Sequence, residues 1–183
     1  MTYLDYSNTD FYIVVKKILL NKGRRVILNK GDYLCRIGER CLTLGMLTSG
    51  SLKYSCPSTN GSERIISFAF AGDLVANYSA MRNNALNSLD VVALESSIVN
   101  ELPVQLVDEV IGQSLRLQFS EALSYRLLKE TIDICCQTAE ERYVALADLI
   151  PDIHNRMTNR TIASYLGIAP ESLCRLRKRL LTT

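Results

Sequence analysis

Short apolar segments separated by glycine dominate the first hundred residues. Seven of the nine glycines fall between Gly23 and Gly72, and the segments between them are rich in Val, Ile, Leu, Tyr and Phe. This spacing is typical of short strands joined by tight turns, and Asn60-Gly61 is a hairpin signal. About eight strands at this spacing predict a jelly roll rather than a parallel sheet. A short helix is expected before them, over 10–20. The expected strands are 24–29, 33–37, 42–48, 51–56, 63–70, 89–95 and 97–102.

The pattern becomes helical after Pro103, and only one glycine, Gly112, occurs before Pro151. A helix over 113–137 would be about 37 Å long, and apolar residues extend beyond a single core-facing stripe. Such a helix is either covered by the C-terminal segment or paired with the same helix of a second subunit, and its length favours pairing. A further helix is expected over 139–150, ended by the proline. The expected dimerisation residues are Leu115, Phe119, Leu123 and Leu127.

The segment TNRTIASYLGIAPESLCRLRKRL, at 158–180, carries the strongest local signal. Thr158 fits a helix cap, Gly167 can end that helix in a left-handed turn, and Pro170 suits the first position of a second helix. Two helices joined by a short glycine-containing turn match a helix-turn-helix, although helical hairpins with basic faces also occur as packing units. The outward side chains of the second helix suit base edges and phosphates. They are Glu171, Ser172, Arg175, Lys178 and Arg179.

Charge is unevenly distributed, although the net charge is only +2. Residues 1–30 and 151–183 each carry a net charge of +4, whereas residues 31–150 carry −6. A basic segment can be a solvated helix face, but its clustering at the C-terminal end makes nucleic-acid binding a real alternative. The apolar content of 48% indicates a folded globular chain. Because there is no long apolar run and no basic, apolar leader, we expect a cytoplasmic protein with no membrane partner.

Cysteine and histidine usage argues against metal, redox and catalytic centres. Six cysteines, Cys35 and Cys41 among them, show no compact ligand spacing, so we expect reduced thiols and no metal site. Cys135 and Cys136 are expected to be buried or boundary side chains, and His154, the sole histidine, a solvated loop residue. Without a G-x-S-x-G or paired-acid motif, neither an enzyme nor a cofactor is expected.

The order of parts, a glycine-punctuated roll, a long helix and a helix-turn-helix, resembles the cyclic-AMP receptor protein and fumarate-nitrate regulator (CRP/FNR) superfamily of bacterial transcription factors. The resemblance covers nearly the whole chain, and its last block is similar to shortened members from the Bacteroides group. It is carried by VILNKGDYLCRIGE at 26–39, LTSGSLKYS at 47–55, FAFAGDLVANYSAM at 68–81 and IASYLGIAPESLCRLRKRL at 162–180.

The resemblance implies roles for the residues of the helix-turn-helix. Glu171, Ser172 and Arg175 stand where family members read bases, and Pro170 stands at the neighbouring contact position. Thr158 and Arg160 stand near the backbone-contacting start of the first helix. Only residues 181–183 follow the second helix, so the β-hairpin wing of many relatives is not expected in full.

The resemblance also implies a pocket in the roll, but this chain departs from the cyclic-nucleotide pattern. Members that bind cyclic nucleotides use a Gly-Glu pair for the ribose and an Arg-Ser pair for the phosphate. Here these positions read Ala76-Asn77 and Asn87-Ser88. An amide cannot replace the bidentate, charge-assisted contact of arginine, so cyclic AMP is not expected to bind in the usual way. Arg82 could replace the anchor, which leaves a cyclic nucleotide or another small anion as an alternative. The candidate pocket residues are Arg64, Asn77, Arg82, Asn87 and Ser88.

Oxygen and haem sensing are not expected either. The iron–sulfur signature of oxygen-sensing members is absent, because residues 1–34 contain no cysteine. His154 lies beyond the roll, away from any place for an axial ligand.

These features together predict an α+β chain with three parts. Residues 1–102 form a cyclic-nucleotide-binding-like roll, 103–137 a dimerisation helix, and 138–183 a helix-turn-helix. We expect a homodimeric regulator that binds double-stranded DNA at an approximately palindromic site, with recognition helices about 34 Å apart. RNA polymerase is an expected partner, and the effector is not identified. An alternative of another class is an interaction module whose basic tail binds an acidic partner.

Overall fold

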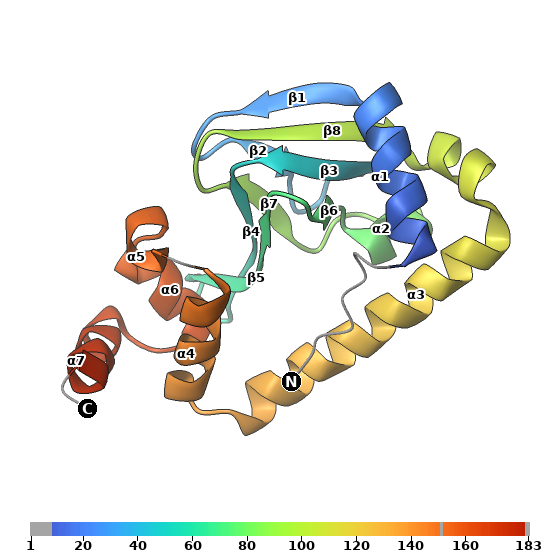
Figure 1. Cartoon of the computed structure of the whole chain (residues 1–183). Coiled ribbons are helices and arrows are strands. Elements are labelled where there is room, and N and C mark those ends of the chain that lie inside the picture. The colour runs from blue at the N-terminus through green and yellow to red at the C-terminus, as the bar shows by residue number, and fades with distance from the viewer. Residues whose placement is uncertain (1–8, 151, 182–183) are drawn as a thin grey trace.

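The computed structural model describes residues 9–150 and 152–181. Three parts of the chain lie outside these residues. They are most of the N-terminal segment, in which no secretory signal is expected, Pro151, and the end of the C-terminal tail, in which no full wing is expected. Among the described residues, no helix is long and apolar enough to cross a membrane. Figure 1 shows a β-roll with a long helix along its side and the C-terminal helices gathered beyond one end of a sheet.

Within the described residues, eight strands form two four-stranded antiparallel sheets, which confirms the expected jelly roll. The strand orders are β1-β8-β3-β6 and β2-β7-β4-β5. Two short elements lie outside the expected ranges, strand β6 and the helix after it, α2 (Tyr78–Arg82). Both are too short to show a sequence period. The strands are β1 Arg24–Leu28, β2 Tyr33–Cys35, β3 Thr43–Ser49, β4 Ser51–Pro57, β5 Glu63–Phe70, β6 Leu74–Val75, β7 Asp90–Ala93 and β8 Ser97–Pro103.

Helix α1 (Asp10–Lys22) precedes the roll, as expected, and extends two residues further. The Thr9 side chain caps it by accepting a hydrogen bond from the Tyr12 main-chain N–H at 3.2 Å. Its β-branched residues are poor helix formers, but Val15 and Leu19 are fully buried against the roll and α3. This packing outweighs the local propensity.

The long helix α3 (Val104–Cys136) consists of two segments that meet at Gly112. Gly112 has φ 66° and ψ 178°, values outside the helical region. The second segment therefore begins at residue 113, where the sequence indicates the start of the long helix. It runs beside α1 and continues past the roll (Figure 1).

The four expected dimerisation residues do not share one environment. Phe119 is 6% exposed and stacks on Phe11 with ring centroids 4.1 Å apart, so its assignment to the interface is wrong. It belongs to the core of its own protomer, because α1 covers this face of α3. Leu115 and Leu123 are half-buried against the same core, and Leu127 is exposed.

The last four helices are α4 (Ala139–Leu149), α5 (Ile153–Arg156), α6 (Asn159–Leu166) and α7 (Pro170–Leu181). Helix α5 was not expected, because four residues are too few to show a period. The four helices share one hydrophobic cluster with Ile65 and Phe68 of β5. The C-terminal segment therefore packs on the end of the roll, and large apolar side chains along α3 stay exposed.

Two expectations about the cysteines are wrong. Cys35 and Cys41 form a disulfide, with their Cα atoms 6.3 Å apart. The loop after β2 brings them together, which a spacing of six residues does not reveal. Cys135 and Cys136, at the C-terminal end of α3, are exposed rather than buried or at a boundary. This end of α3 extends beyond the roll (Figure 1).

The expectation that His154 is a solvated loop residue is also wrong. It lies on α5, half-buried, with its Nε2 atom 2.7 Å from the Tyr143 hydroxyl oxygen of α4. Burial lowers the pKa of His154, and the positive charge of Arg177 lowers it further. The ring therefore serves as a neutral packing and hydrogen-bonding group between helices.

Candidate DNA-binding surface and effector cavity

Helices α6 and α7 form a helix-turn-helix whose local signals are those of the sequence. The Thr158 hydroxyl accepts a hydrogen bond from the Thr161 main-chain N–H at 3.1 Å and so caps α6. Gly167 ends α6 with φ 76° and ψ 29°, in the left-handed region that favours glycine. Pro170 is the first residue of α7.

Helix α7 has a buried stripe and an exposed basic face. Leu173 and Leu176 are 0% and 8% exposed in the C-terminal cluster. On the other side Glu171, Arg175 and Lys178 are exposed, and the expected outward face of α7 is therefore present. Ser172 is half-buried and accepts a hydrogen bond from Arg175 Nη2 at 3.2 Å, while Arg179 is exposed and Pro170 lies at the exposed start of the helix.

Ion pairs and hydrogen bonds fix the edges of this surface. Arg179 forms an ion pair with Glu140 of α4, so this cation already has an internal carboxylate partner. Arg177 Nη1 donates to Asn159 Oδ1 at 3.3 Å and ties α7 to the start of α6. Sequence reasoning missed both contacts, because neither partner stands at a helical spacing from its arginine.

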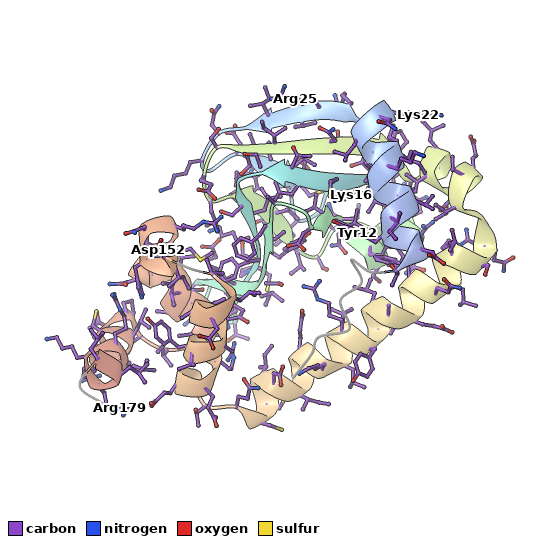
Figure 2. The ribbon with its side chains drawn as sticks, in the orientation of Figure 1. Tyr12, Lys16, Lys22, Arg25, Asp152 and Arg179 are labelled. Carbon is purple, nitrogen blue, oxygen red and sulfur yellow. A yellow bond between two sulfur atoms is a disulfide. The ribbon has the colours of Figure 1, made fainter. Side chains whose placement is uncertain are left out.

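The start of α6 completes the surface. Thr158, Asn159 and Arg160 are all exposed there, so the expected backbone-contacting residues are accessible. The two basic ends of the chain do not form one surface, because Lys22 and Arg25 lie near α1 and β1, far from α7 (Figure 2). The candidate DNA-binding surface therefore comprises the start of α6 and the outer face of α7.

A cavity of about 770 Å³ lies between the roll and α3. It is lined by residues of β4, β5, β6, α2 and α3, and of the five candidate pocket residues it includes Asn77 and Arg82. Burial raises the pKa of the Tyr54 phenol in its wall. The walls are largely apolar, with side chains that include Ile66, Phe68, Leu74, Leu89, Leu117 and Leu127.

The three arginines in the cavity wall each have an acidic neighbour. Arg82 holds Asp108 of α3 through two hydrogen bonds of 2.5 and 2.9 Å. Arg116 Nη1 lies 3.7 Å from the same carboxylate, and Arg126 Nε donates to Glu130 at 2.8 Å. Arg82 is therefore not a free anchor for a phosphate. Its partner lies 26 residues away, on a different element, and no sequence spacing indicates it.

The other candidate pocket residues are dispersed. Asn77 lines the cavity and caps α2, with Oδ1 accepting from the Ala80 main-chain N–H at 3.4 Å. Asn87 is 3% exposed and is not part of the cavity wall, and Ser88 is exposed. Among the described residues, buried donor atoms without a partner include Asn77 Nδ2 and Arg82 Nε, both from residues of this wall.

Arg64 is also displaced from its expected place. Its guanidinium packs against Gly167, so close that a Cβ atom at that glycine would lie 2.3 Å from Arg64 Nη2. The sequence position of Arg64 on β5 is as expected, but its side chain points to the helix-turn-helix. Its assignment to the pocket is wrong, because α6 packs on this edge of the sheet.

Comparisons with known proteins agree with this architecture. Residues 25–114 match the family model of the cyclic nucleotide-binding domain. The chain is 30% identical over 172 residues to the fumarate and nitrate reduction regulatory protein of Vibrio cholerae, a match that covers 85% of this chain and 68% of that protein. Electron transport regulator A of Shewanella oneidensis is 27% identical over 172 residues, with 85% and 68% covered.

Solved structures share the fold. FixK2 from Bradyrhizobium japonicum superposes with a TM-score of 0.71 at 16% identity, over 87% of this chain and 85% of that one. A CRP/FNR family regulator from Eubacterium rectale gives a TM-score of 0.68 at 18% identity, over 98% and 88%. With a cyclic-nucleotide-binding-like roll, a long helix, an exposed helix-turn-helix and this level of identity, the chain belongs to the CRP/FNR family of transcriptional regulators.

Proposed function

We propose that this regulator is a homodimer that reads an approximately palindromic DNA site with α7. The observation that carries the proposal is the exposed face of Glu171, Arg175 and Lys178 on a helix whose leucines are buried. An arginine on such a face can bind guanine through two hydrogen bonds, and a glutamate can accept from cytosine N4. Thr158 and Arg160, exposed at the start of α6, are placed to contact phosphates.

The second subunit would pair along α3. Leu117, Leu128 and Ile132 are 59%, 61% and 51% exposed, and their spacing puts them on one side of the helix. Tyr125, 53% exposed, lies at the margin of this side. These residues, rather than Phe119, form the proposed interface. We propose that residues 1–102 form the sensor domain, that residues 103–137 form the dimerisation helix and that residues 138–183 bind DNA.

The cavity supports a second element of the proposal, control by a small molecule. Because its arginines are paired with carboxylates, we propose that cyclic AMP is not the effector. The alternative, a cyclic nucleotide or another small anion, requires that a ligand displace Asp108 from Arg82. We further propose a cytoplasmic protein without catalytic activity that acts on RNA polymerase.

Base reading can be separated from general attraction to DNA by two substitutions on α7. The operator sequence is first identified by mapping the sites on genomic DNA that the bound protein protects. Arg175→Ala should then weaken the free energy of binding to that operator by about 1–3 kcal/mol. It should also relax the base preference at one base pair per half-site. Lys178→Ala should weaken operator and scrambled duplex alike and lower the salt slope by about 1.

The matched control is Lys17→Ala, which removes an exposed charge from α1, distant from α7. It should leave both affinities unchanged. If Arg175→Ala weakens both duplexes equally, Arg175 does not read a base. If the wild-type protein protects no site, the proposed function itself is wrong.

A further inference from the structure

A serine of the helix-turn-helix forms hydrogen bonds with the main chain at the edge of the roll. Strand β5 is the outer strand of its sheet, so its main-chain groups on one side have no neighbouring strand. Ser164 of α6 lies against this edge. Its hydroxyl donates to the Glu63 carbonyl oxygen at 2.8 Å and accepts from the Ile65 N–H at 3.1 Å. One side chain thus satisfies a donor and an acceptor that the sheet leaves open.

Arg64, which lies between Glu63 and Ile65 on β5, contacts the C-terminal end of α6. The Arg64 guanidinium packs on Gly167, where α6 ends. Arg142 of α4 donates to the Tyr165 and Leu166 carbonyl oxygens at 2.9 and 3.3 Å. Two cations therefore lie at the C-terminal, electronegative end of α6, one from the roll and one from the helical part.

Apolar and charged contacts flank the serine. Phe68 of β5 and Tyr165 of α6 have ring centroids 5.2 Å apart, and Ile65 is 2% exposed in the C-terminal cluster. Further along, Arg156 Nη2 lies 3.0 Å from Glu95 Oε1. Hydrogen-bonding and apolar contacts therefore hold α6 on the roll, and an ion pair holds the neighbouring α5.

We propose that Ser164 is a positioning residue for DNA binding, which fixes α6, and with it α7, on the edge of β5. The proposal rests on the proposed function of this surface. Helices α6 and α7 pack together, so a fixed α6 also fixes the distance of the recognition helix from the roll and from α3. A dimer must present two such helices one DNA turn apart, and fixing them beforehand removes a cost of ordering at binding.

Three variants of the full-length protein test this role. Ser164→Ala removes both hydrogen bonds, Ser164→Thr keeps a hydroxyl, and Thr48→Ala is the matched control. Thr48 also donates a side-chain hydrogen bond to a main-chain oxygen, that of Ile98 at 3.1 Å, but within the roll. Hydrogen exchange at the Ile65 amide reports directly on the contact, and titrations with the operator and a scrambled duplex report on function.

In Ser164→Ala the Ile65 amide should exchange about tenfold faster, as expected from the loss of hydrogen bonds of ordinary strength. Operator affinity should fall, by at most the same factor of about ten. Affinity for the scrambled duplex should stay unchanged, because the basic face is intact. Ser164→Thr should restore both values, and Thr48→Ala should change neither. A merely destabilised helix-turn-helix would lower both affinities together.

The proposal is overturned if Ile65 exchange does not change in Ser164→Ala, if both duplexes weaken equally, or if operator affinity does not fall. Failure of the proposed function has a different signature, because the wild-type protein would then prefer no duplex. In that case the exchange result alone decides whether Ser164 holds α6 on β5.

Discussion

Replacing Leu128 by glutamate should dissociate the proposed dimer without unfolding the protomer. Leu128 is 61% exposed on α3. Complete burial of a leucine side chain contributes about 1.5–3 kcal/mol, so covering the exposed part contributes about 1–2 kcal/mol. In a two-fold dimer the residue occurs twice, which gives about 2–4 kcal/mol, or a roughly 30- to 1,000-fold weaker dimer. The cost of burying a carboxylate adds to this loss.

Sedimentation equilibrium across nanomolar to micromolar concentrations measures the dimer constant, and urea unfolding of the dissociated chain measures protomer stability. The matched control is Leu149→Glu, the same change at a leucine of α4 that is 67% exposed. By contrast, Phe119→Ala should destabilise the protomer by about 3–5 kcal/mol, because it empties a stacked core position. A wild-type monomer at micromolar concentration, or an unaltered dimer in Leu128→Glu, would refute the reasoning.

Two further predictions concern the cavity and pH. Millimolar cyclic AMP should give little thermal stabilisation. A ligand present at 100 times its Kd would add about 2.7 kcal/mol to the free energy of unfolding. Saturable calorimetric binding of cyclic AMP in the micromolar range would show that the paired arginines open for a phosphate. Because the pKa of His154 is lowered in the folded state, the unfolded chain binds more protons, and the free energy of unfolding should fall as pH drops below about 6.5. His154→Gln should reduce the difference in urea midpoint between pH 7.5 and pH 5; an unchanged difference would mean that other groups cause it.

The helix-turn-helix was predictable because its determinants are local. A cap at Thr158, a left-handed glycine at Gly167 and a proline at Pro170 each act within one helical turn, so their sequence spacing is sufficient. The strands of the roll were predictable for a similar reason, since glycine marks their turns. The bounds of β5 coincide with the expected 63–70.

The site was less predictable where a side chain depends on a distant partner. The sequence leaves Arg82 available as a phosphate anchor, but in the structure it is paired with Asp108 of α3. Arg64 was placed in the pocket from its strand, but α6 draws it to Gly167. Phe119 shares a helical face with Leu127, yet α1 covers only the former. In each case tertiary packing decides what periodicity leaves open.

Strand β5 is the element through which the cavity and the DNA-binding surface can influence each other. Residues 66–69 line the cavity, while Glu63 and Ile65 bind Ser164 of α6 through their main chain. Phe68 belongs to both sides, because it lines the cavity and packs on Tyr165. A molecule that shifts Phe68 must therefore also change the packing beneath α6. This shared packing supports the proposed control of DNA binding by a small molecule in the cavity.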